Sequence, residues 1–269
     1  MKLSFMTWVC PDWDLSQILT AAIRYGYDGV EPRVEVDHRH GIDLSTTKKR
    51  RKEIKAQFAD CGLEISCLAT SRTYSSMPAS ERDASVALTL KYIDLAADLG
   101  CPNLRVFGGQ IPADVPREEA HRSVAECLRR CGEYAAQRKV YVGLETHDDF
   151  SRAADAAETV RLADHPNVGI VWDVMHPIRA GDTMESAFEQ VKPFARHCHV
   201  HDGTRPTDPS GGWELALMGE GDIPHDEAVR LLKTIDFQGH LSGEWIGFRP
   251  ADEILPHDAR VLKGYIARA

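Results

Sequence analysis

The sequence lacks the patterns of several large classes of protein. Its seven cysteines are odd in number, scattered, and never arranged as Cys-x-x-Cys, which indicates neither a disulfide framework nor a thiolate zinc site. No apolar run approaches the roughly 20 residues that span a bilayer, and the segment Met1–Trp13 is unlike a signal peptide. We therefore expect a cytoplasmic protein with reduced thiols and no membrane partner.

Basic charge is also in deficit. Lysine and arginine number 32 against 41 aspartates and glutamates, which gives a formal net charge of −9 at pH 7. The single basic run, residues 48–52, falls in a helical pattern with Ile54 and Phe58 and is typical of a solvated helix face. Proteins that bind the phosphate backbone need a clustered basic surface, so we expect no nucleic-acid partner.

The glycine-rich fingerprint of a dinucleotide-binding fold is missing as well. No Gly-x-Gly-x-x-Gly follows the first predicted strand, and the Gly219-Glu220-Gly221 segment lies in a loop near the end of the chain. The fingerprint binds pyrophosphate where it joins a strand to a helix. We therefore expect no nucleotide cofactor.

Apolar spacing predicts eight strands that alternate with eight helices. Such alternation implies a parallel sheet, and eight units in about 250 residues match a closed barrel better than an open sheet. The fold class is therefore α/β, and we expect one (β/α)8 TIM barrel domain over residues 1–269. The predicted strands are residues 3–8, 29–33, 63–68, 103–107, 140–145, 168–172, 197–200 and 241–245. The predicted helices begin near residues 14, 45, 80, 116, 151, 182, 225 and 252, with an irregular loop at 206–222.

Four successive predicted strands, the fifth to the eighth, each end in one potential metal ligand. Active sites of such barrels lie at this end of the strands, and an acid buried there is costly unless it is paired or bound to a cation. Three carboxylates and one imidazole favour one divalent ion, Mn²⁺, Mg²⁺, Co²⁺ or Zn²⁺. The alternative is that the four act separately as helix caps and ion-pair partners. These residues are Glu145, Asp173, His199 and Glu244.

Three histidines alternate along the seventh predicted strand. His197, His199 and His201 would share one face of that strand, which suits a metal or proton-transfer site because imidazole ligates and titrates near neutral pH. The alternative is a polar strand end whose histidines bond to loops, and we expect this for His201. Residues 202–204 are predicted to form a turn.

Four segments at these strand ends resemble the motifs of the xylose-isomerase-like TIM-barrel superfamily. They are Gly143-Leu144-Glu145, Val171-Trp172-Asp173-x-x-His176, His197-x-His199-x-x-Asp202 and Leu241-Ser242-Gly243-Glu244-Trp245. The superfamily includes ketose 3-epimerases, hydroxypyruvate isomerase, inosose dehydratase, dehydroshikimate dehydratase and endonuclease IV. The resemblance covers the whole chain and implies a homodimer or homotetramer that acts on a small sugar or polyol.

By position, the four strand-end residues correspond to the metal ligands of the epimerases. The resemblance also places His176 and Arg205 where those enzymes hold substrate oxygens. The epimerases carry a further acidic residue soon after the strand-five glutamate, where this chain has residues 148–150, Asp-Asp-Phe. This departure argues against a simple ketohexose epimerase.

The expected reaction is proton transfer next to a carbonyl. A divalent ion that chelates a carbonyl and an adjacent hydroxyl acidifies the neighbouring C–H bond, and Glu145 and Glu244 are the candidates that move the proton through an enediolate. This chemistry suits a metal-dependent sugar or polyol isomerase or epimerase, which we place first, and a dehydratase or keto-sugar lyase, the alternative. His147, on the strand face of Glu145, is a third catalytic candidate as acid or base. It could instead orient Glu145 or contact the substrate, and a Glu-x-His pair also fits eliminases of keto sugars.

Further side chains are candidates for binding the substrate. We include Trp8 and Glu31 with His176 and Arg205, although Glu31 could instead be neutralised by an arginine, Arg33 or Arg105. Four aromatic residues either wall the substrate or fill the barrel: Trp8, Trp13, Phe107 and Trp213. The histidines expected to face solvent are His121, His165, His240 and His257.

Two rival functions are weaker. The trinuclear zinc site of endonuclease IV needs extra histidines after strands three and four, where this chain has residues 69–71 and 107–109, and an Asp-x-His at the position of Trp213 and Leu215. A non-catalytic sugar-binding barrel would be free to lose metal ligands, yet all four candidates are present.

Overall fold

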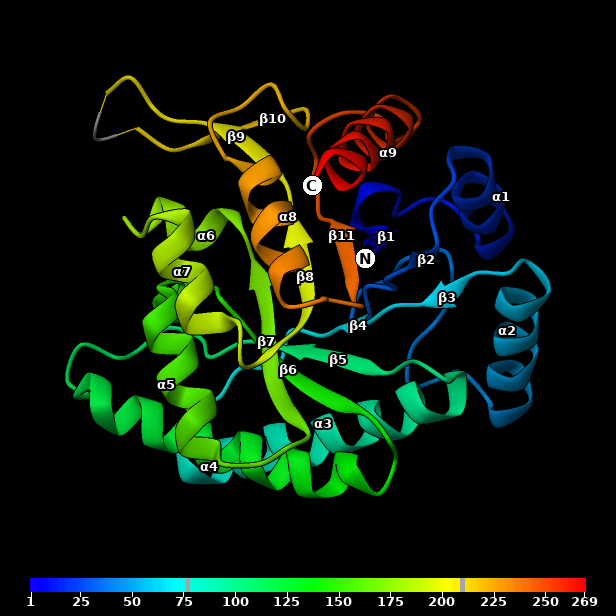
Figure 1. Cartoon of the computed structure of the whole chain (residues 1–269). Helices are drawn as coiled ribbons and strands as arrows, with labels where there is room; N and C mark the ends of the chain where they lie inside the picture. Colours follow the sequence, from blue (N-terminus) through cyan, green and yellow to red (C-terminus); the bar gives the residue numbers. More distant parts are fainter. Residues whose placement is uncertain (76–77, 209–210) are drawn as a thin grey trace.

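The structure, a computed structural model, describes residues 1–75, 78–208 and 211–269 and has a curled parallel sheet at its centre. The strands of this sheet are β1 (Lys2–Phe5), β4 (Leu68–Ala69), β5 (Asn103–Val106), β6 (Tyr141–Glu145), β7 (Val168–Asp173), β8 (Ala195–Val200) and β11 (His240–Gly243). Their order is β1-β11-β8-β7-β6-β5-β4, as Figure 1 shows. All neighbours pair in parallel, as expected for strands joined by helices.

A short strand pair completes the ring between β1 and β4. β2 (Gly29–Val30) pairs in parallel with β3 (Glu64–Ile65). Single bridges join this pair to the main sheet, from Met6 to Glu31 on one side and from Arg33 to Ala69 on the other. The (β/α)8 barrel predicted from the sequence is therefore confirmed. The third predicted strand is divided into β3, which pairs with β2, and β4, which pairs with β5.

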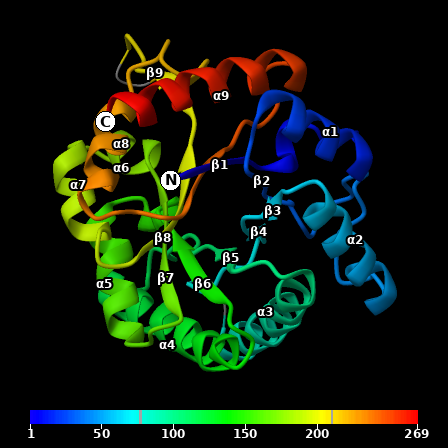
Figure 2. The same ribbon diagram turned by 45° about the vertical axis from the view of Figure 1, so that its right-hand side comes forward.

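The helices form an outer ring around the strands (Figure 2). They are α1 (Leu15–Tyr25), α2 (Lys48–Asp60), α3 (Ala79–Leu99), α4 (Arg117–Ala136), α5 (Ala153–Ala163), α6 (Met175–Arg179), α7 (Met184–Val191), α8 (His225–Thr234) and α9 (Ala251–Arg268). Apolar spacing sets the buried face, as in α1, where Leu15, Ile18 and Ala22 are buried. None of the described helices has the length and apolar character needed to cross a bilayer.

Two helices begin later than the sequence predicts. Thr47 rather than Ser45 caps α2, because the Thr47 hydroxyl accepts the Arg50 N–H at 3.2 Å. Helix α5 begins at Ala153, two residues after Ser151, which was the predicted cap. The Ser151 hydroxyl instead donates to the Asp148 carbonyl at 2.6 Å, so it closes the preceding turn and is not available to the helix.

A hairpin follows β8, where the sequence predicted a turn and an irregular loop. β9 (Asp202–Thr204) pairs antiparallel with β10 (Glu214–Ala216), so the predicted turn at 202–204 is wrong. The Asp202 carboxylate holds this region together because it accepts four backbone N–H groups at 2.8 to 3.2 Å. The donors are Gly203, Gly219, Gly221 and Ile223.

Two of the histidines expected to face solvent are buried. The His121 ring packs 5.3 Å from the Phe150 ring, and the His240 ring lies 6.3 Å from His197 inside the barrel. His121 lies on the buried face of α4, and His240 lies at a buried position of β11. Their polar side chains led to the wrong expectation of solvent exposure.

Candidate metal centre

The carboxyl ends of β6, β7, β8 and β11 bring the four predicted ligands together. Glu145 ends β6, Asp173 ends β7, and Glu244 follows β11. The register of β7 and β8 sets Asp173 directly opposite His199. One ligand atom from each of the four side chains lies within 4.8 Å of the other three. The barrel therefore creates the convergence that the strand-end pattern predicts.

The negative charge around His199 suits a cation. Oε1 of Glu145 lies 3.1 Å and Oε2 of Glu244 lies 2.9 Å from Nδ1 of His199. One ring N–H cannot satisfy two carboxylates, and acids packed this closely in a dry site are costly without a compensating cation. Asp173 is fully buried, and the Glu244 side chain is only 12% exposed. Three carboxylates and an imidazole in this arrangement fit one divalent ion.

Protonation of His199 is tied to the same acids. Burial alone would lower the pKa of His199, but Glu31, Glu145 and Glu244 raise it well above its usual value. Burial would likewise raise the pKa of Glu244, and the charge on His199 lowers it to about 2. An imidazolium ion thus balances the acids, and a metal ion would take over that role with release of a proton.

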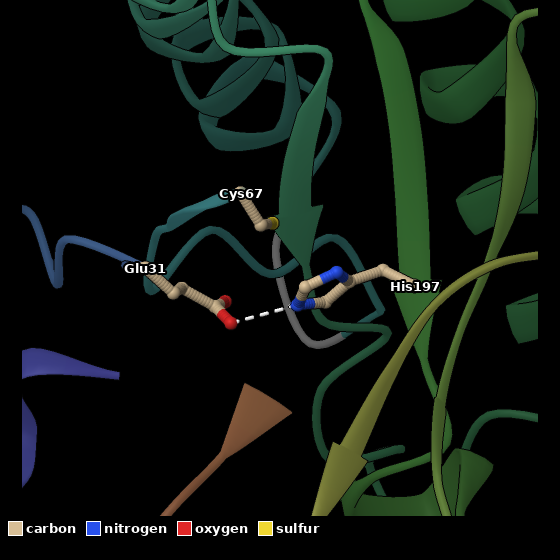
Figure 3. Close-up of side chains that lie close together, drawn as sticks. All are labelled: Glu31, Cys67 and His197. Carbon is tan, nitrogen blue, oxygen red and sulfur yellow. Dashed lines mark hydrogen bonds and ion pairs between the residues drawn. The ribbon is translucent and has the colours of Figure 1, made fainter. Parts of the chain in front are cut away.

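Glu31 lies behind His199, inside the barrel. Its carboxylate accepts hydrogen bonds from Nε2 of His197 at 2.8 Å and from Nε2 of His199 at 3.0 Å, and Figure 3 shows the first of these. All three side chains are fully buried. The hydrogen-bond partners of Glu31 are therefore histidines and not Arg33 or Arg105, which the sequence analysis gave as the alternative to a substrate contact.

Two backbone N–H groups and the His201 ring hold the carboxylate of Asp173. Oδ1 accepts the Met175 and His176 N–H groups at 2.8 and 3.0 Å, which fixes the carboxylate at the start of α6. Oδ2 lies 2.8 Å from Nε2 of His201 and 3.8 Å from Nε2 of His176. The expectation that His201 bonds to a loop is wrong, because the ring bonds to a candidate ligand.

Arg105 lies beside the second carboxylate oxygen of Glu145. Its Nε lies 3.2 Å from Oε2 of Glu145, and both side chains are almost completely buried. The guanidinium carbon lies 4.1 Å from the centre of the Phe107 ring. One Glu145 oxygen thus lies beside His199 and the other beside Arg105, although Oε2 and the Arg105 Nε lack hydrogen-bond geometry and Oε2 has no hydrogen-bond partner among the described residues.

His147 opens onto a cleft of about 690 Å³ whose lining includes His176, Arg179 and Trp213. Its ring lies 4.5 Å from the His176 ring and 4.6 Å from the Phe107 ring. Nδ1 of His147 lies 2.9 Å from Oδ1 of Asp148. Burial lowers the pKa of His147, but Asp148 and Glu145 outweigh it and raise the value to about 8.

The remaining predicted substrate contacts lie around the barrel mouth. Arg205 is exposed at the end of β9, and its guanidinium carbon stands 5.4 Å from the centre of the Trp213 ring. Trp8 is half-buried after β1, 5.1 Å from the guanidinium carbon of Arg33. Trp13 lines a separate groove on α1. Of the four aromatic candidates, Trp213 lines the cleft and Phe107 touches His147.

Comparison with known proteins agrees with this geometry. The family described as xylose isomerase-like TIM barrel matches residues 19–265. The chain belongs to this family. The superfamily resemblance seen in the strand-end motifs is thereby confirmed, and the match runs through all four candidate ligands.

Individual relatives are more distant. A 3-dehydroshikimate dehydratase of Bacillus anthracis is 28% identical over 174 residues, 59% of this chain and 61% of that protein, so this chain spans less than two thirds of its length. The crystal structure of the probable 3-DHS dehydratase AsbF from Bacillus anthracis is 23% identical, with a TM-score of 0.81 over 98% of this chain and 99% of that one. The IOLI protein with a bound zinc atom is 20% identical, with a TM-score of 0.80 over 100% and 97%. At these identities the two structures show a shared fold.

Proposed function

We propose that the protein is a divalent-metal-dependent dehydratase, a lyase that removes water from a polyhydroxylated ketone. In this proposal Glu145, Asp173, His199 and Glu244 hold one divalent ion, and His147 is the catalytic base. The substrate lies in the cleft that His147 lines with His176 and Trp213. The chain would thus carry out the reaction that the sequence analysis placed second.

The observation that carries the proposal is the contrast between Glu145 and His147. The Glu145 side chain has no exposure and lies between His199 and Arg105, so this carboxylate is poorly placed to accept a proton from a substrate. His147, two residues along the chain, is 34% exposed at the cleft, and Asp148 contacts only its Nδ1. Nε2 of His147 is therefore the ring nitrogen that we assign to proton transfer.

The proposed step is a β-elimination. The C–H bond next to the ketone breaks, and His147 takes the proton. The electron pair forms a C=C bond as the C–O bond on the next carbon breaks, and the departing hydroxyl takes a proton from the His147 imidazolium to leave as water. Substrate becomes product plus water, and His147 returns to its starting state.

Other groups of the site stabilise and orient the substrate. A divalent ion, when bound, supplies a Lewis acid for the ketone oxygen. Asp148 orients the His147 ring through Nδ1 at 2.9 Å, as a carboxylate does for catalytic imidazoles elsewhere. His176 and Arg205 are proposed to contact substrate oxygens, and Trp213 to cover an apolar face of the substrate.

The comparisons support a dehydratase through one relative. The 28% identical protein is named a 3-dehydroshikimate dehydratase, and a zinc-bound structure occurs among the proteins of the same fold. We therefore propose a substrate of that chemical kind, a ketone with a hydroxyl on the carbon next to the acidic C–H, and leave the metal as one of the four predicted ions.

Isomerisation or epimerisation is the second candidate, and the exposure of Glu244 favours it. Glu244 is the most exposed of the four candidate ligands, at 12% of its side chain. A carboxylate open to the substrate could act with His147 as the second proton-transfer group that an isomerase or epimerase needs.

Turnover in D₂O tests the two candidates together. The metal-loaded protein is incubated with a panel of ketoses and hydroxylated cyclic ketones that includes 3-dehydroshikimate. The proposal predicts a product lighter by one water. An isomer or epimer of unchanged composition, with deuterium at the carbon next to the carbonyl, would favour the second candidate. Neither product with any panel member would contradict both.

A further inference from the structure

Glu31 is a fully buried acid of the barrel interior, and it bonds to two histidines at once. Oε2 lies 2.8 Å from Nε2 of His197, and Oε1 lies 3.0 Å from Nε2 of His199. All three side chains have no exposure. The two ring contacts cross the barrel, because Glu31 follows β2 while both histidines belong to β8.

The direction of these hydrogen bonds decides which nitrogen of His199 faces the metal centre. A carboxylate can only accept, so Nε2 of His199 must carry the hydrogen that Glu31 receives. Nδ1 then points to Glu145 and Glu244, at 3.1 and 2.9 Å. Nδ1 is therefore the ring nitrogen that faces the other candidate ligands, and it can coordinate a metal ion once its own hydrogen has left.

The surroundings of Glu31 separate it from solvent and from the cleft. Cys67 lies close to Glu31 and His197, as Figure 3 shows, and ligand atoms of the three side chains lie within 4.8 Å of one another. Burial and the nearby Glu31 charge raise the pKa of the Cys67 thiol well above its usual value, so the thiol is protonated in the metal-free protein. Glu31 does not line the cleft where His147 and Trp213 lie.

We propose that Glu31 is a positioning residue for the metal centre. It keeps the hydrogen on Nε2 of His199 and so turns Nδ1 toward the metal centre, and His197 anchors Glu31 from the other side. The inference rests on the proposed metal centre. Carboxylates that accept a hydrogen bond from the far nitrogen of a metal-bound histidine typically account for about 10- to 100-fold in metal affinity.

Zinc titration of metal-free protein tests the proposal without relying on turnover. Glu31→Gln keeps the size of the side chain but turns one acceptor oxygen into a donor, which opposes the Nε2–H of one histidine. We expect a zinc Kd about 10- to 100-fold higher than wild type. Glu64→Gln on β3 is the matched control, since Glu64 is half-exposed and lies outside the candidate ligands, and its Kd should equal that of wild type.

Each other outcome overturns the inference in a distinguishable way. An unchanged Kd in folded Glu31→Gln removes the positioning role and leaves the metal centre intact. Two zinc ions in wild type, one of them lost in Glu31→Gln, would make Glu31 a ligand. No zinc binding by wild type would remove the metal centre and the positioning role together.

A measurement on wild type decides the matter if Glu31→Gln does not fold. Nitrogen-15 NMR of the zinc-loaded protein reports which ring nitrogen of His199 carries hydrogen. We expect hydrogen on Nε2 and zinc on Nδ1. Zinc on Nε2 with hydrogen on Nδ1 would overturn the proposal.

Discussion

Two groups of ionisable side chains reach the candidate metal centre from different sides. The interior cluster, Glu31, Cys67 and His197, connects to it through His199 and is completely buried. The mouth cluster, His147, Asp148 and His176, connects to it through Asp173 and opens to the cleft. A hydrogen bond joins Glu31 and His197 away from solvent, whereas the second group faces the cleft in which we propose that the substrate binds. The difference suggests that the interior sets the ligand geometry and the mouth performs the chemistry.

Removal of His199, which joins the metal centre to the interior cluster, should have the largest effect on metal binding and turnover. His199→Ala deletes both the Nδ1 ligand and the partner of Glu31. We expect loss of bound metal and turnover at background level, because the Lewis acid is lost. His165→Ala, a half-buried histidine after α5, is the control. Stoichiometric metal in His199→Ala by elemental analysis would contradict the ligand set.

A change in the mouth cluster should separate chemistry from metal binding. His147→Asn removes the proposed base but touches none of the four ligands. Turnover should fall by about 10²- to 10⁴-fold, with metal content and unfolding temperature as in wild type. Steady-state kinetics with parallel metal analysis makes the check. Near-normal kcat would remove His147 from the mechanism, and joint loss of metal would assign it to the centre instead.

A substitution at the rim of the barrel mouth should affect substrate binding more than the rate of turnover. Trp213→Ala removes a cleft wall and the ring that Arg205 stacks on. Loss of one aromatic contact, about 1 kcal/mol, raises KM roughly fivefold, while kcat stays near wild type because His147 and the ligands are intact. A kcat change larger than the KM change would place Trp213 closer to the reacting atoms than the cleft geometry indicates.

A buried acid outside both clusters should affect stability alone and leave turnover unchanged. Burial raises the pKa of Asp258 to about 6, although His257 and the Met218 N–H oppose the shift. The pKa of Asp258 in the folded protein lies above its ordinary value, so protonation of Asp258 stabilises the fold. This stabilisation grows as pH falls from 7 through 6 and is complete below about 4.

Asp258→Asn removes this charge, and we expect a higher Tm at pH 7.5 than wild type, worth about 1–3 kcal/mol, with little gain at pH 4.5. Thermal unfolding at the two pH values measures the effect. A lower Tm at both values would mean that Asp258 is as well paired as Glu31. That result would weaken the contrast between the interior cluster and other buried acids.

The candidate ligands could be predicted because they follow from topology. Parallel strands with helical crossovers bring all carboxyl ends to one mouth, so Glu145 and Asp173 meet whatever the details of packing. The register that sets Asp173 opposite His199 needs no side-chain information beyond the strand positions.

The contacts of Glu31 could not be predicted, because its partners lie across the barrel. β2 and β8 are not neighbours in the sheet, and no periodic pattern reports which side chains meet through the interior. The alternation of His197 and His199 was the available signal, since it put both rings on the face that Glu31 reaches. The β9–β10 hairpin was not predicted for another reason. The Asp202 carboxylate, and not apolar spacing, holds this region in place.

Anomalous diffraction from crystals of the manganese-loaded protein tests the central claim most directly. The three groups of candidate ligands share residues or touch one another, so the position of the ion discriminates among them. We predict one peak among Glu145, Asp173, His199 and Glu244. A peak among Glu31, Cys67 and His197, or among Asp173, His176 and His201 without the two glutamates, would contradict the account, as would the absence of any peak in the barrel.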